Sequence, residues 1–444
     1  MNGVNPAYFT GGLVVAFFAW QVVARKFDPF APIWLFLVGY TQIYVVQAIS
    51  YQDWALRVRG PELVASANAR ALWALAWLLA VYGLGPGRRL AGLLPRPPRR
   101  WSAPAVVWSS PVLIVWGLFC AAMVMRSSSE PTAMSAEQSL LASFPLVMLV
   151  AGILLIVTGR QPDRPRPALV ASGVATVGLY MLIWMFNGKR SHSLVAVLTG
   201  VCAFYVPRLG RPSWTVLVAT ALAGAMAVGL SIGWRYYANR TGKQGSLSDF
   251  TAFVSAFDFE TVLESVNLKD GDGDGAERPS YETEEIGGYY LMVDTVPEKA
   301  DYDYGVNYLR IFSTYIPRIV WADKPIFGRD QWTAAWVAGS EVKRDAAFTG
   351  PSIGILGATH LNGGAWGTMI VLGCAGLALR TSYEYFRLHA GAPWAQAWWT
   401  LTYYNAWLMT VGDDPLTWFY YNYGFTTLPP LMGFWLLNKI GDRA

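Results

Sequence analysis

Long apolar runs separated by short polar turns dominate the chain. Most of these runs have about 18 residues or more, which is enough to cross the hydrocarbon core of a bilayer as a helix. We therefore expect an all-α, polytopic membrane protein with about eleven transmembrane helices and one large folded extracytoplasmic loop. The predicted spans are residues 7–24, 32–50, 69–85, 105–125, 139–158, 168–186, 192–206, 214–234, 352–379, 393–411 and 416–437.

The spacing of these runs divides the chain into three predicted regions. Residues 1–234 form a membrane region of eight helices, and residues 352–444 form one of three helices. Residues 235–351 are too long and too regularly patterned for a simple connector, so we expect a mainly helical extracytoplasmic domain. Within it, Ser248 is placed to cap a helix that has Phe250 and Phe253 on one face.

Composition supports the membrane assignment. The chain has 444 residues, of which 54% are apolar and only 14% charged, whereas soluble domains average about 25% charged residues. The net charge of +5 follows from basic loops and gives no reason to expect nucleic acid as a partner. The first apolar run lacks a basic region before it and a cleavage site after it, so we expect a retained helix and not a signal peptide.

Basic residues follow every odd-numbered span, whereas the alternate short loops hold few of them. Because basic loops stay cytoplasmic, this bias predicts an N-terminus outside and a C-terminus in the cytoplasm. The cations that follow odd-numbered spans are Arg25, Lys26, Arg88, Arg89, Arg96, Arg99, Arg100, Arg160, Arg164, Arg166, Arg208, Arg211, Arg380, Arg387, Lys439 and Arg443.

One outer turn departs from this bias. Lys189 and Arg190 lie in a five-residue break between two apolar runs, on the side where cations should be scarce, and His192 opens the next run. Two cations at this end of a helical hairpin suggest a site for an anion at the membrane surface, such as a lipid phosphate.

Two later stretches carry a resemblance to a known family. Residues 315–325 contain an Ile-Pro-Arg sequence followed by Trp and Lys-Pro, and residues 362–367 read Asn-Gly-Gly-Ala-Trp-Gly. This pair, together with the basic turn and the many spans, resembles the oligosaccharide repeat unit polymerase (O-antigen polymerase) family. The family often has a carboxylate just before its Asn-x-Gly segment, where this chain has Ala358, Thr359 and His360.

The resemblance implies a glycosyltransferase of a bacterial inner membrane that polymerises polyprenyl-diphosphate-linked repeat units at the outer leaflet. The implied partners are that lipid-linked glycan, membrane lipids and chain-length regulator or export proteins. Arginine and lysine would bind the leaving diphosphate. A guanidinium donates paired hydrogen bonds to phosphate oxygens, and an ammonium contributes a positive charge. The diphosphate candidates are Lys189, Arg190, Arg235, Arg240, Arg310, Arg318 and Lys324.

Other side chains are candidates for the remaining roles. His360 is the sharper candidate for a general base, since neutral imidazole is available near pH 7. Asp413 and Asp414 either take part in catalysis or cap the following helix, and Trp332 and Trp336 either stack on sugar rings or line the membrane interface.

No cofactor is expected. An acidic stretch resembles the opening of a calcium loop, but Tyr281 stands where the bidentate Glu should be, so a plain acidic turn is the preferred interpretation. The three carboxylates of this stretch are Asp270, Asp272 and Asp274.

Three alternatives remain open from sequence. An O-antigen-type ligase needs the same diphosphate site and differs only in its acceptor; the related ligases use a His in a comparable outer loop. A polysaccharide or lipid transporter would place ionisable residues near mid-membrane. A non-enzymatic scaffold of an export complex would need none of the candidate residues.

Overall fold

The protein is described here by a computed structural model. The structure describes residues 5–98, 100–127, 144–241, 247–256, 285–309, 312, 316, 321, 353–411, 424 and 426–443. Within these ranges the regular elements are all helical, with no strand. The predicted all-α class is confirmed for this part of the chain.

Among the described residues, six helical segments are long and apolar enough to cross a membrane. They are Pro6–Val23, Pro32–Ser50, Pro61–Leu84, Ala103–Val124, Pro167–Phe186 and Trp214–Arg235. Each one overlaps a span predicted from the hydropathy pattern. The chain is therefore a membrane protein with several apolar helices, and the full number of eleven spans stays a prediction.

Two predicted spans are not single helices. The one at residues 352–379 contains a break after Leu361, and the one at 393–411 contains a break after Thr402. The predicted span 139–158 matches a shorter apolar helix, Leu146–Gly159. The predicted outer domain, residues 235–351, lies largely outside the described ranges. Its first predicted helix is present as Leu247–Ser255, but Ser248 is the second residue of this helix and not its cap.

The chain forms two compact units, each built from segments that lie far apart in sequence. The first unit comprises Met1–Leu94, Lys269–Tyr385 and Asn405–Tyr420. Its described elements are α1 (Pro6–Val23), α2 (Pro32–Thr41), the π-helix η1 (Gln42–Gln47), α3 (Ala48–Ser50), α4 (Gln52–Arg59), α5 (Pro61–Leu84), α6 (Gly87–Leu93), α15 (Glu285–Thr295), the 3₁₀ turn η3 (Val306–Leu309), α18 (Gly354–Leu361), most of α19 (Gly364–Leu388) and α21 (Asn405–Val411).

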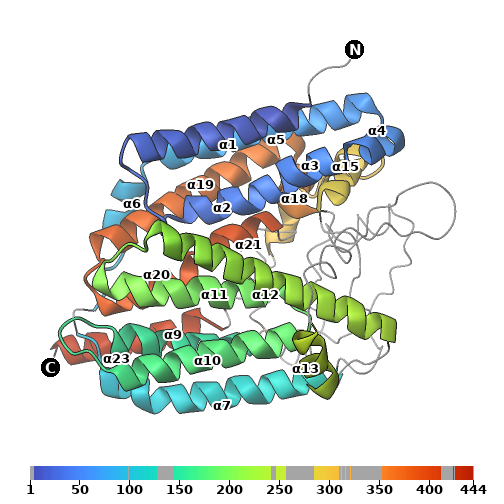
Figure 1. Ribbon diagram of the computed structural model, residues 1–444. Coiled ribbons are helices and arrows are strands. Elements are labelled where there is room, and N and C mark those ends of the chain that lie inside the picture. Colours follow the sequence, from blue (N-terminus) through green and yellow to red (C-terminus); the bar gives the residue numbers. More distant parts are fainter. Residues whose placement is uncertain are drawn as a thin grey trace. The chain divides into compact units, whose positions relative to one another are not determined.

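Helix α5 lies alongside α1 in the first unit (Figure 1), and its buried alanines form a face that receives tyrosine side chains of other helices. The small side chains of Ala67 and Ala71 let tyrosines reach the helix backbone. Tyr289 of α15 donates its hydroxyl hydrogen to the Ala67 carbonyl over 3.0 Å, and Tyr40 of α2 donates to the Ala71 carbonyl over 2.6 Å. Buried hydroxyl groups are thereby satisfied by backbone oxygens, which fixes α15 and α2 against α5.

The second unit comprises Pro95–Leu268, Phe386–Tyr404 and Tyr421–Ala444. Its described elements are α7 (Ala103–Ser127), α9 (Leu146–Gly159), α10 (Pro167–Phe186), α11 (Arg190–Tyr205), the 3₁₀ turn η2 (Val206–Arg208), α12 (Trp214–Thr241), α13 (Leu247–Ser255), α20 (Pro393–Thr402) and α23 (Leu428–Arg443). All 14 residues of α9 are buried, because α7, α10, α11 and α20 pack around it.

Glycines allow the closest of these contacts. An added Cβ at Gly173 of α10 would meet the Gly152 carbonyl oxygen and Ile156 Cγ1 at 2.6 Å. Small residues let membrane helices approach in this way. The Gly152 and Gly173 pair therefore sets the spacing of α9 and α10.

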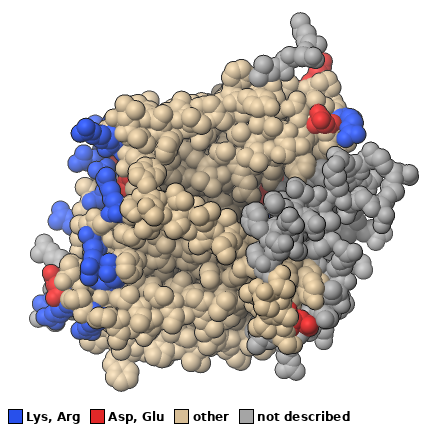
Figure 2. All heavy atoms as spheres, viewed as in Figure 1, with Lys and Arg blue, Asp and Glu red and all other residues tan. Residues whose placement is uncertain are grey.

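Within each unit, most of the Lys and Arg side chains visible in Figure 2 lie at one end of the helices. In the first unit, Arg380 of α19 lies over the Tyr82 ring near the end of α5, 5.4 Å from its centre. In the second, Arg160 after α9 donates to the Phe204 carbonyl near the end of α11 over 3.1 Å. Loops predicted to share one side of the membrane thus meet at one end of each unit.

Candidate functional site

The turn that connects α10 to α11 is the cationic break singled out from sequence. The Asn187 amide donates to the Ile183 carbonyl over 2.7 Å, and the N–H groups of Gly188 and Lys189 donate to carbonyls in the last turn of α10. Gly188 has φ +64°, a left-handed conformation that suits glycine at a helix end. A Cβ there would also meet Arg235 Cβ at 2.9 Å, so glycine brings α12 against the turn.

The close approach at Gly188 brings two predicted cations together. By surface area Lys189 is exposed, yet enough protein surrounds its ammonium that burial, followed by the charge of Arg235, lowers the pKa of Lys189. Arg190 adds a third cation as the first residue of α11, where the helix dipole disfavours positive charge. This end of the second unit therefore concentrates positive charge where an anion would be stabilised.

An aromatic cluster holds α12 and α13 against the end of α10. Trp234 donates its indole N–H to the Phe186 carbonyl over 2.7 Å, and Phe250 of α13 packs edge-on against Trp234 with ring centres 5.1 Å apart. His192 stacks on Trp184 with ring centres 4.3 Å apart. These contacts fix the helices that carry the cations, and they place His192 among aromatic rings.

His360, the predicted general base, lies in the first unit near the end of α18 and is 3% exposed. Its Nδ1 accepts a hydrogen bond from the Arg70 guanidinium, and its Nε2 lies 2.9 Å from the Val296 carbonyl oxygen. A guanidinium can only donate, so Nδ1 is the acceptor and Nε2–H donates to Val296. In this arrangement neither nitrogen offers a lone pair to a substrate hydroxyl, as a general base must.

The contacts of His360 require a neutral ring, because a proton on Nδ1 would displace the hydrogen bond from the Arg70 guanidinium. Tyr302 packs edge-on against it, with ring centres 6.0 Å apart.

The Asn-Gly-Gly segment that follows His360 is the break between α18 and α19. Gly363 and Gly364 have φ +142° and +61°, and a Cβ at Gly367 would meet the Thr359 carbonyl oxygen at 2.5 Å. The Asn362 side chain accepts from the Gly305 N–H over 3.0 Å and donates to the Ala358 carbonyl over 2.8 Å. This segment therefore has a structural role: it ends α18 and ties it to the turn at Gly305.

Arg70 was missed by the sequence analysis because it falls inside a predicted apolar span. It lies on α5, is half-buried, and contacts the neutral His360 ring. No carboxylate lies within ion-pair distance of Arg70 in the part of the chain that the structure describes. The available signal was a cation within an apolar run, which is costly in a membrane and by default functional.

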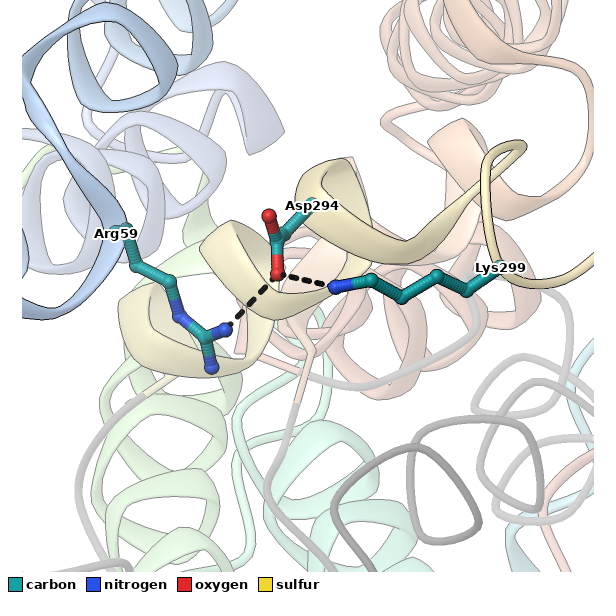
Figure 3. Close-up of polar contacts among 3 residues, drawn as sticks. All are labelled: Arg59, Asp294 and Lys299. Carbon is teal, nitrogen blue, oxygen red and sulfur yellow. Dashed lines mark hydrogen bonds and ion pairs between the residues drawn. The ribbon is translucent and has the colours of Figure 1, made fainter.

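Another arginine of the first unit, in contrast to Arg70, forms an ion pair. Arg59, at the end of α4, pairs with Asp294 of α15 over 3.1 Å, and Lys299 pairs with the same carboxylate oxygen over 3.2 Å (Figure 3). The charge of Arg59 is thus directly compensated by a protein carboxylate.

A second polar contact in the first unit involves a buried carboxylate. Glu285 is 4% exposed, and its Oε2 accepts from Gln47 Nε2 over 2.7 Å. Gln47 lies in the π-helix η1, a type of distortion that is frequent at functional sites. Neither residue stands out in the sequence, since each has an ordinary sequence context.

Most other predicted site residues lie outside the described ranges. Arg240 belongs to α12, but its side chain is not described. Among the described residues, no group of three or more His, Cys, Asp or Glu could hold a metal ion. The predicted residues outside the described ranges are Asp270, Asp272, Asp274, Arg310, Arg318, Lys324, Trp332, Trp336, Asp413 and Asp414.

Comparisons with known proteins identify no relative: no family model, no curated protein and no solved structure matches the chain.

Proposed function

We propose that the chain is a membrane glycosyltransferase that polymerises polyprenyl-diphosphate-linked oligosaccharide repeat units at the outer leaflet of a bacterial cytoplasmic membrane. The observation that carries the proposal is the approach of Lys189 to Arg235, with Arg190 beside them. They lie at the end of the second unit opposite Arg160 and the other loop cations. If the basic end faces the cytoplasm, this cluster faces the outer leaflet.

The reaction is a substitution at the anomeric carbon of the donor glycan. The bond from that carbon to the diphosphate oxygen breaks, and the lipid diphosphate leaves with the electron pair. A hydroxyl oxygen of the acceptor glycan forms the new glycosidic bond and gives its proton to a base or to water. Negative charge builds up on the leaving diphosphate, and fixed cations stabilise that charge in the transition state. Lys189, Arg190 and Arg235 supply them in this proposal.

One observation favours a second candidate, a transporter of anionic lipid-linked glycans. Arg70 lies inside the apolar helix α5, and transporters place ionisable residues within the membrane. A ligase remains a closer variant of the main proposal, because it uses the same leaving group with another acceptor.

The proposal is tested by supplying the purified full-length chain with a lipid-diphosphate-linked repeat unit and separating the products by length. A ladder of multiples is expected for a polymerase. Transfer of one unit only, and only when a different acceptor is added, would replace the polymerase with a ligase. Movement of the intact substrate across proteoliposomes without a new product would favour the transporter.

A further inference from the structure

Arg70 is a charged side chain with no carboxylate within ion-pair distance among the described residues. It is the tenth residue of α5, about 14 Å along the helix from its first residue. Its contact at His360 is a neutral ring that accepts a single hydrogen bond. A partly buried cation without a counter-charge is destabilising, so an anionic ligand would recover stability. Arg59, with its carboxylate partner, would gain nothing comparable.

The same contact leaves Arg70 prepared for a ligand. His360 is itself fixed by the Val296 carbonyl, so the guanidinium is held by a ring that cannot rotate freely. A guanidinium has five N–H donors in one plane, and among the described residues only His360 accepts from Arg70, so the other donors remain for oxygen acceptors. That planar set matches the oxygens of a diphosphate better than an ammonium does. Tyr302 packs edge-on against His360, with its hydroxyl beside Gly364, so it supports the ring that holds Arg70.

We propose that Arg70, held by His360, binds a second lipid diphosphate at a site in the first unit. The inference rests on the proposed function, in which donor and acceptor glycans each carry a diphosphate and a polymerase must hold two of them. Lys189 and Arg235 of the second unit bind one diphosphate, and Arg70 binds the other. His360 is a positioning residue in this site and takes no part in proton transfer.

The test is to count bound lipids by native mass spectrometry on the full-length chain in detergent, with undecaprenyl diphosphate that carries no glycan. The wild type is expected to bind two lipids. Arg70→Lys should weaken one of the two sites by about tenfold to a hundredfold, because a charged hydrogen-bond pair is lost. Arg59→Lys is the matched control in the same unit, and both sites should keep their affinity.

A second pair of variants separates positioning from folding. His360→Gln can still accept from Arg70 and donate to the Val296 carbonyl, so it should retain both lipids. His360→Leu should lose the same lipid as Arg70→Lys while keeping Arg70 itself. In Arg70→Lys and His360→Leu, the preference for undecaprenyl diphosphate over undecaprenyl monophosphate should fall. If the Arg70–His360 contact only held α5 against α18, this preference would not change.

Several outcomes would overturn the proposal. Two lipids bound with unchanged affinity by a folded Arg70→Lys chain would remove Arg70 from the site. Equal binding of phosphatidylglycerol would make Arg70 a general headgroup contact, and complete competition by inorganic pyrophosphate would identify a free diphosphate as the ligand.

Failure of this proposal is distinguishable from failure of the proposed function. A wild-type chain that makes a glycan ladder but binds one lipid contradicts only the second site. A chain that binds two lipids through Arg70 and makes no ladder contradicts only the polymerase.

Discussion

At the level of single residues, the imidazole of His360 is held between the Arg70 guanidinium and the Val296 carbonyl. A histidine at this place in the sequence suggested a general base. Its two hydrogen bonds keep the ring neutral and leave neither nitrogen with a lone pair for a substrate. Lys189 lies in the turn between α10 and α11, where the hydropathy pattern placed it. The partners of a buried histidine come from distant segments and are not visible in the sequence.

Replacement of Lys189 should lower the activity and change how the activity depends on pH. Lys189→Gln should lower kcat/KM for polymerisation by about tenfold to a hundredfold, since one charged contact to the leaving group is lost. Because the pKa of Lys189 is lowered, wild-type activity should fall as pH rises towards that pKa. Lys189→Arg keeps its charge and should extend activity to higher pH. The control is Arg166→Gln, an exposed cation at the opposite end of the second unit, which should stay near wild-type activity.

At the level of helices, the positions of the six long apolar segments could be predicted from hydropathy, but the interruption at Asn362 could not. Averaging over a long window hides Asn362, Gly363 and Gly364 among apolar neighbours. The structure uses their backbone freedom to end α18, which places His360 in a short buried helix beside Arg70. The resemblance had marked this segment as important, and its physical role is to turn the chain.

The α9–α10 contact gives a prediction at this scale. Gly173→Ala forces a Cβ against backbone and side-chain atoms of α9 at 2.6 Å, so it should destabilise the chain by about 1–3 kcal/mol. Gly178→Ala, in the same helix with no atom within 4 Å of the added Cβ, should be neutral or slightly stabilising. Heat inactivation of both variants in detergent measures the difference. Equal stability would show that α9 and α10 can separate without cost.

At the level of the whole molecule, the charge pattern predicted which loops share a side, and the meeting of basic loops at one end of each unit supports it (Figure 2). The division into two units could not be predicted. Each unit joins segments separated by more than a hundred residues, and hydropathy carries no information about such pairings.

Cysteine labelling tests the orientation in intact cells. After replacement of Cys120, Cys202 and Cys374, single cysteines are introduced at exposed positions of each unit. Asp53→Cys and Lys189→Cys should react with a membrane-impermeant maleimide from outside. Arg89→Cys and Asp163→Cys should react only after permeabilisation. The reverse pattern would place the cationic turn in the cytoplasm and remove the basis for an outer-leaflet site.

The most direct test of the polymerase is the stoichiometry of its reaction. Purified chain is incubated with one lipid-diphosphate-linked repeat unit, and each product is weighed by mass spectrometry while free polyprenyl diphosphate is quantified. A polymerase predicts products that carry several repeats on one lipid diphosphate, with one free polyprenyl diphosphate released for each new glycosidic bond. Substrate that stays a single repeat on its lipid, with no free polyprenyl diphosphate, would contradict the proposed function.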